Sequence, residues 1–263
     1  MTAIPGVGPG AVLEIEDLTV VRGGAKVIDE ADLLIERGDY VGLVGPNGGG
    51  KTTLIRAILG YLPKEDGSIR LFGKDIEGFD EWHRVAYVPQ DAINFDQQFP
   101  LSVRELVSLG RVRRSNLFRR LNRDDWEKVD EALEFMGIAD LSERRIGQLS
   151  GGQKQRAFVA KALVLDPELL MLDEPLSGMD AGTQEKFYGK LSELNREKGT
   201  TIMVVSHDLT AVFDRMTRVV CVNRRVHESG VGSGEETLRK AYGDHFRFVY
   251  HRPESEEGST DGV

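Results

Sequence analysis

The sequence predicts an α/β fold built on a mainly parallel sheet with a helical insertion, and two observations lead to that prediction. Short apolar runs with the length of buried strands recur along the chain, and helical patterns separate several of them. A stretch of different character, from about Phe99 to Leu149, interrupts this alternation and predicts an inserted helical subdomain. No apolar run approaches the roughly 20 residues needed to cross a bilayer.

The predicted core elements follow in chain order. Val12–Val21 is rich in β-forming residues with partial alternation, which predicts a strand near a sheet edge. Tyr40–Gly45 is short, apolar and bounded by glycine, and predicts a buried strand. Lys51–Leu59 places its apolar side chains on one helical face. Further buried strands are predicted at Val85–Val88, Leu169–Leu172, Thr201–Val205 and Val219–Val222.

Helix boundary signals mark the insertion. Ser102 with Glu105, and Asp124 with Glu127, have the spacing of a capping box before apolar residues. Gly137 is a typical helix stop. Outside the folded region we expect a flexible N-terminal tail over residues 1–11 and a disordered acidic tail over residues 251–263.

Composition limits the function classes. The 263 residues carry a net charge of −9 without a Lys/Arg-rich stripe, so we expect no nucleic-acid partner. Cys221 is the only cysteine, which excludes an intramolecular disulfide and fits a reducing compartment. The first residues have neither a basic segment nor a sustained apolar run, and therefore do not indicate a signal peptide.

A glycine-rich segment between a predicted strand and a predicted helix matches the phosphate-binding P-loop. Its backbone N–H groups and the helix N-terminus present positive charge to phosphate oxygens. We expect Lys51 to reach the β- and γ-phosphates of a nucleoside triphosphate and the Thr52 hydroxyl to coordinate Mg²⁺. The residues predicted to bind the nucleotide here are Gly45, Pro46, Asn47, Gly48, Gly49, Gly50, Lys51, Thr52 and Thr53.

Two adjacent carboxylates, Asp173 and Glu174, end the apolar run that begins at Leu169. Such a pair alone is more often a solvated strand end. With a P-loop in the same chain, Asp173 is expected to hold Mg²⁺ and Glu174 to polarise an attacking water.

The segment Leu149, Ser150, Gly151, Gly152 and Gln153 opens an apolar-faced helix and predicts a second anion-binding site. It reads LSGGQ, the signature of the ATP-binding cassette (ABC) family, and the chain resembles that family from about Val12 to Tyr250. The resemblance implies a RecA-like P-loop NTPase fold over residues 12–250, with an N-terminal antiparallel β subdomain and a helical subdomain inserted at about 96–158. It also implies ATP hydrolysis with Mg²⁺ as cofactor.

The resemblance implies further site residues. Gln90 matches the Q-loop glutamine, a Mg²⁺ ligand that senses the membrane partner, and Asp180 lies in the matching D-loop. His207 matches the switch histidine that contacts the γ-phosphate. In the family, the signature of one subunit completes the P-loop site of another, which implies a head-to-tail homodimer. Taken alone, Gln90 and His207 would be ordinary surface residues.

Two positions depart from the family pattern. Where an aromatic residue usually stacks on adenine, this chain has Arg22, whose guanidinium plane is able to stack on a base. Gly49 stands where serine is common, and since the phosphate contact there is a backbone N–H, the loop is expected to function.

The chain also resembles ABC importers for zinc and manganese, which implies uptake of zinc first, with manganese or iron next. The partners implied are polytopic membrane permease subunits and an extracytoplasmic metal-binding protein, at the cytoplasmic face of the cell membrane. A soluble ABC ATPase, such as an iron–sulfur cluster assembly factor, is the alternative. A P-loop kinase or GTPase would leave the signature unexplained. The segments that carry the subfamily resemblance are the P-loop glycines, Phe95–Pro100, Leu101–Arg111, Arg144–Gln148, Asn223–Arg225 and Ala241–Gly243.

Overall fold

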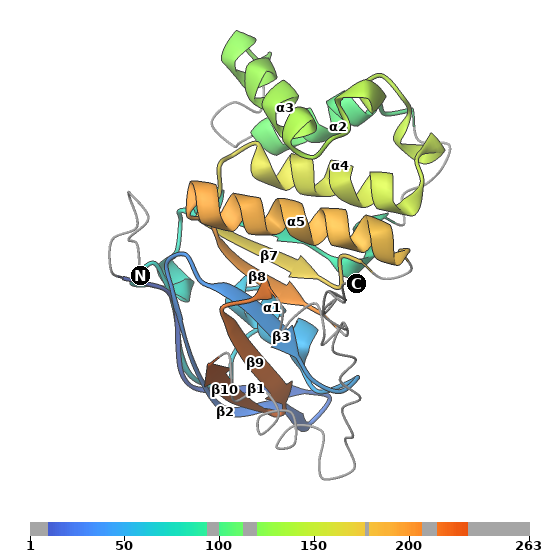
Figure 1. Cartoon of the computed structure of the whole chain (residues 1–263). Helices are drawn as coiled ribbons and strands as arrows, with labels where there is room; N and C mark the ends of the chain where they lie inside the picture. Colours follow the sequence, from blue (N-terminus) through green and yellow to red (C-terminus); the bar gives the residue numbers. More distant parts are fainter. Residues whose placement is uncertain (1–9, 94–99, 113–119, 177–178, 207–214, 231–263) are drawn as a thin grey trace, which may run out of the picture.

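A six-stranded sheet forms the centre of the protein (Figure 1). The computed structural model describes residues 10–93, 100–112, 120–176, 179–206 and 215–230. The strand order is β10-β9-β3-β8-β7-β6, and every pairing is parallel except that of β10 with β9, which confirms the mainly parallel sheet. The strands are β3 (Tyr40–Val44), β6 (Val85–Val88), β7 (Leu169–Asp173), β8 (Thr201–Val205), β9 (Arg218–Asn223) and β10 (Arg225–Gly230).

A second, antiparallel sheet has the order β2-β1-β4-β5 and confirms the N-terminal β subdomain. Its strands are β1 (Ala11–Arg22), β2 (Ala25–Glu36), β4 (Asp66–Leu71) and β5 (Lys74–Asp75). β1 pairs on both sides and lies next to the edge strand β2, which agrees with the predicted position near a sheet edge. Charged residues interrupt the apolar pattern of β2, which is why the neighbour that covers β1 is hard to recognise in the sequence.

Two apolar layers hold the sheets and helices together. Along β7, Leu169 and Met171 pack toward the antiparallel sheet and α1 (Lys51–Ile58), whereas Leu170 and Leu172 pack toward the helices on the other face. Those helices include α4 (Gly151–Leu163) and α5 (Ala181–Lys198), which lie above β7 in Figure 1. Burial on both faces explains why the central strands are apolar runs without alternation.

The predicted helical insertion is present. It contains α2 (Val103–Ser108) and α3 (Arg123–Phe135), which pack on each other and on α4. Ser102 and Glu105 form the predicted capping box. The cap predicted at Asp124 is wrong, since Asn122 caps α3 in a box with Asp125. Gly137 follows the last helical turn in a left-handed conformation, as a stop residue does.

Short 3₁₀ turns complete the described part of the chain: η1 (Ile76–Gly78), η2 (Trp82–Arg84), η3 (Gln90–Ile93), η4 (Leu109–Arg111), η5 (Ala139–Leu141) and η6 (Ile146–Gln148). Both predicted tails fall almost entirely outside the described residues. No helix among the residues described combines the length and apolar character needed to cross a membrane.

The parallel strands bring distant segments to one edge of the sheet. Gly45 follows β3, Gln90 lies just beyond β6, Glu174 follows β7 and Ser206 follows β8. The carboxyl ends of parallel strands meet at the same edge. The fold therefore places residues from four separate motifs along one side of the molecule.

Candidate functional site

The P-loop joins β3 to α1 and holds its lysine inside the loop. Lys51 is 6% exposed, and its Nζ donates to the carbonyl oxygens of Gly45 at 2.8 Å and Pro46 at 3.1 Å. Burial lowers the pKa of Lys51, and attraction to Glu174 and Asp173 opposes that shift. The ammonium is thus bound to backbone oxygens that a phosphate oxygen would replace.

The hairpin of β9 and β10 braces the P-loop from behind. The Arg224 N–H donates to the Gly49 carbonyl at 2.9 Å, and the Asp29 N–H donates to the Arg224 carbonyl at 2.8 Å. A Cβ on Gly45 would lie 2.1 Å from the Val222 carbonyl oxygen, and one on Gly49 would lie 2.6 Å from the same oxygen. Glycine at 49 is therefore a packing requirement of this chain, which the sequence did not reveal.

Asp173 ends β7 with a carboxylate that is only partly satisfied. The side chain is 2% exposed, and its Oδ1 is buried without a hydrogen-bond partner among the described residues. The Tyr87 hydroxyl lies 3.5 Å from Oδ2. Burial raises the pKa of Asp173, while the Thr52 hydroxyl opposes the shift. A buried carboxylate oxygen next to a threonine hydroxyl fits the oxygen donors that a hard divalent cation prefers.

Glu174 is held by a residue from another motif. The Gln90 Nε2 donates to the Glu174 Oε2 at 2.7 Å, which joins the end of β6 to the end of β7. The Glu174 backbone has a φ of 48°, in the left-handed region that residues with a side chain adopt at a cost. This conformation turns the chain at the end of the strand, beside the P-loop.

A cavity of about 380 Å³ lies over the P-loop. Its walls come from three predicted motifs and from β2, which contributes Val27. The predicted residues that line it are Asn47, Gly48, Gly49, Gly50, Lys51, Thr52, Thr53, Gln90 and Glu174. The sequence analysis did not predict Val27 as a lining residue. The one feature of the sequence that marks it is its position just after the turn at Gly23 and Gly24.

Arg22 lies at the end of β1, opposite Ala25, and its side chain is exposed. It is not among the described residues that line the P-loop cavity, whereas Val27, close to it in sequence, is. The structure therefore does not bring Arg22 into the cavity wall, and the predicted adenine contact stays a prediction.

The signature residues form a separate helix start. Ser150 caps α4 in a capping box with Gln153, Leu149 is buried, and Gly152 packs near Thr183. Asp180 caps α5: its carboxylate oxygens accept from the N–H and hydroxyl of Thr183 at 2.9 and 2.7 Å, which lowers the pKa of Asp180. None of the signature residues lines the described P-loop cavity. His207 lies outside the described residues.

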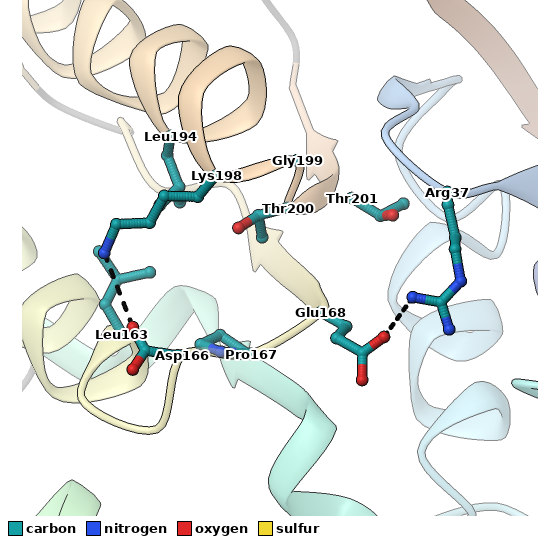
Figure 2. Close-up of a pocket in the computed structure, with 10 residues that line it drawn as sticks. All are labelled: Arg37, Leu163, Asp166, Pro167, Glu168, Leu194, Lys198, Gly199, Thr200 and Thr201. Carbon is teal, nitrogen blue, oxygen red and sulfur yellow. Dashed lines mark hydrogen bonds and ion pairs between the residues drawn. The ribbon is translucent and has the colours of Figure 1, made fainter. Parts of the chain in front are cut away.

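A second cavity, of about 280 Å³, lies at the opposite, amino end of the strands (Figure 2). Glu168 accepts hydrogen bonds there from Arg84, at 2.5 and 3.0 Å, and from Arg37. Lys198 pairs with Asp166 at 3.6 Å. These ion pairs connect neighbouring elements of the fold. Because the charged side chains are already paired with each other, the cavity is a poor candidate for ligand binding.

Comparison with known proteins decides the family. The profile described as "ABC transporter" matches residues 28–177. The zinc uptake system ATP-binding protein ZurA of Listeria innocua is 40% identical over 82% of this chain and 84% of its own length. The chain belongs to the ABC transporter family. As a family member it is an ATPase that binds and hydrolyses ATP, and it acts together with a membrane permease.

Other relatives of this ABC ATPase agree with that assignment. The manganese transport system ATP-binding protein MntB of Bacillus subtilis is 37% identical, over 90% of this chain and 94% of the relative. Among solved structures, cbiO1 of Clostridium perfringens, part of the ABC transporter complex cbiONQ, superposes with a TM-score of 0.76 at 30% identity. That match covers 88% of this chain and 94% of cbiO1.

Proposed function

We propose that this chain is the ATP-binding subunit of an ABC importer that takes up a divalent metal ion, zinc first and manganese or iron next. The observation that carries the proposal is the similarity, over most of the chain, to subunits named for zinc and manganese transport. The intact P-loop cavity, with Lys51, Gln90 and Glu174 in its wall, supports ATP hydrolysis as the energy source.

For the chemical step, we propose that Lys51 leaves the loop carbonyls and contacts the β- and γ-phosphates. Glu174 accepts the proton of the attacking water, and His207 contacts the γ-phosphate. Thr52, Asp173 and Gln90 would hold Mg²⁺, which supplies charge neutralisation at the phosphates. The unsatisfied Oδ1 of Asp173 supports this donor set.

Gln90 has two states in this proposal. In the structure its amide nitrogen binds Glu174, so the carboxylate that is proposed to activate water is already engaged. Recruitment of Gln90 to Mg²⁺ through its amide oxygen would reorient the amide and remove its hydrogen bond to the Glu174 Oε2. Pro89 and Asp91, on either side of Gln90, line a surface groove that a permease segment is able to reach.

We propose that the active form is a head-to-tail homodimer. The signature residues Leu149–Gln153 do not line the described P-loop cavity of their own chain, and the exposed Ser150 and Gly151 are available to the cavity of a second copy. Asp180, at the start of α5, would lie across the same interface. ATP held between both copies favours the closed dimer, and hydrolysis reopens it.

The dimer would act at the cytoplasmic face of the cell membrane, bound to polytopic permease subunits that receive the metal from an extracytoplasmic binding protein. The test is ATP-dependent uptake by the reconstituted complex, with zinc, manganese and iron in competition. We expect uptake in which zinc competes best, and loss of uptake in Glu174→Gln. A chain that forms no complex with any permease would instead support a soluble ABC ATPase, for example in iron–sulfur cluster assembly.

A further inference from the structure

A groove of about 450 Å³ runs between the edge strand β6 and helix α4. Its lining is largely apolar, with Val85 and Tyr87 on the strand side and Phe158, Ala162 and Leu165 on the helix side. Within the described ranges β6 pairs with β7 alone, so the opposite edge of this strand is available along the groove. An accessible apolar groove beside a strand edge is a surface suited to binding another segment of polypeptide.

The far wall of the groove is firmly attached to α4. Gly110, in η4, packs directly on the helix: a Cβ at this position would lie 2.2 Å from the Lys161 carbonyl oxygen. Arg111 donates to the Val164 carbonyl at 3.0 Å. The backbone of η4 that lines the groove at Gly110 is therefore held firmly against α4.

One charged side chain stands out in this groove. Lys161 is half-buried, and no acceptor lies within hydrogen-bond distance of its ammonium among the described residues. Desolvation alone lowers the pKa of Lys161. The other ionisable groups that line the groove are His83 and Asp91, which are exposed, and Tyr87, whose hydroxyl lies 3.5 Å from the Asp173 carboxylate. By contrast, Lys198 is paired with Asp166.

We propose that the groove binds a cytoplasmic permease segment with an apolar face and one carboxylate, and that this carboxylate pairs with Lys161. The apolar face would cover the strand and helix side chains, and the carboxylate would supply the acceptor that the Lys161 ammonium lacks among the described residues. A partner lacking the carboxylate would leave a desolvated charge unpaired, so Lys161 selects among permease segments. This pairing rests on the proposed function, since it requires a permease partner.

The test uses the full chain with the permease identified in the uptake experiment. Lys161→Met keeps the aliphatic stem and removes the charge, Lys161→Glu reverses it and Lys161→Arg keeps it. The control is Lys186→Met, which removes an exposed lysine of α5 outside the groove. We expect Lys161→Met to weaken binding to the permease by about tenfold or more, Lys161→Glu to weaken it further, and Lys161→Arg and the control to bind nearly as the original chain does. The basal ATPase rate of the isolated subunit should stay unchanged in all four variants.

A second measurement identifies the carboxylate directly. A water-soluble carbodiimide joins a lysine amine to a contacting carboxylate as an amide with loss of water, and mass spectrometry of the assembled complex should find Lys161 joined to a permease Asp or Glu. Replacing that acid by Lys should restore binding of the Lys161→Glu chain. If Lys161→Met binds the permease as tightly as the original chain, or Lys161 joins no permease acid, the pairing is wrong. If the original chain binds no permease at all, the proposed function fails instead.

Discussion

Replacing Gly110 by alanine tests the close packing between η4 and α4. A Cβ at this position would lie 2.2 Å from the Lys161 carbonyl oxygen and 2.4 Å from the Val164 Cγ2. An ordinary contact begins near 3.4 Å, so η4 must move away from the helix by about 1 Å. Overpacking of this kind costs about 1–3 kcal/mol of the free energy of unfolding.

Gly189→Ala is the matched control, because it makes the same chemical change in open space. Gly189 lies inside α5, and a Cβ there would meet no atom within 4 Å. Alanine favours the helix over glycine, so this variant should gain about 0.5–1 kcal/mol. The two Gly→Ala changes are therefore expected to shift stability in opposite directions.

Urea unfolding, followed by the fluorescence of Trp82 and Trp126, measures both effects. For a urea slope of about 3 kcal/mol/M, Gly110→Ala should lower the midpoint by about 0.3–1 M and Gly189→Ala should raise it by about 0.2–0.3 M. Equal midpoints for Gly110→Ala and the original chain would refute the packing analysis. So would two shifts of the same sign and size.

Four further predictions concern the site and its support. Glu174→Gln should retain ATP binding and accumulate ATP-bound dimers, while the rate of hydrolysis falls at least 100-fold because the amide cannot accept a proton. Rapid hydrolysis by this variant in a single-turnover assay would show that Glu174 does not accept the proton of the attacking water. Tyr87→Phe removes the hydroxyl 3.5 Å from Asp173, and should raise the Mg²⁺ concentration for half-maximal ATPase by about two- to fivefold without lowering thermal stability. An unchanged Mg²⁺ titration would mean that the hydroxyl does not position the carboxylate. Arg22→Ala should weaken ATP binding more than Arg22→Tyr does, measured by calorimetry, and unchanged affinities in both variants would remove this arginine from the adenine site. Arginine neighbours hold the pKa of Glu168 below its ordinary value, so its contribution to stability is present above about pH 4.5 and is lost as the pH falls through the lowered pKa. Glu168→Gln should therefore cost on the order of 1 kcal/mol at pH 7 and flatten the acid limb of the stability curve, and an acid limb identical to that of the original chain would contradict this.

Much of the phosphate end of the site is predictable from the sequence, because each motif is local. The P-loop, the carboxylates after β7 and the apolar strands between them are contiguous segments whose residue types reflect one structural role. Parallel strand topology then brings Gln90 and Glu174 to the same edge. The capping box at Ser102 was predictable for the same reason.

Features that depend on contacts between distant segments were not predictable. Asn122 caps α3 in place of Asp124, since both have suitable side chains and only the tertiary path selects between them. The edge strand β2 was not predicted, because charged residues interrupt its apolar pattern and only its pairing with β1 shows that it is a strand. From the sequence, Gly49 is only a position where serine is common in the family. The structure shows that the Val222 carbonyl leaves no room for a Cβ at this position.

The brace behind the P-loop has a consequence for the order of biosynthesis. The P-loop is made early, but the N–H that donates to the Gly49 carbonyl belongs to Arg224. The carbonyl that packs against Gly45 and Gly49 belongs to Val222, two residues before Arg224 in the sequence. At about 5–20 residues per second, a ribosome reaches that hairpin roughly 9–35 s after it has made the loop. During that interval the P-loop of the nascent chain lacks this backbone support, so stable nucleotide binding awaits synthesis of the β9–β10 hairpin.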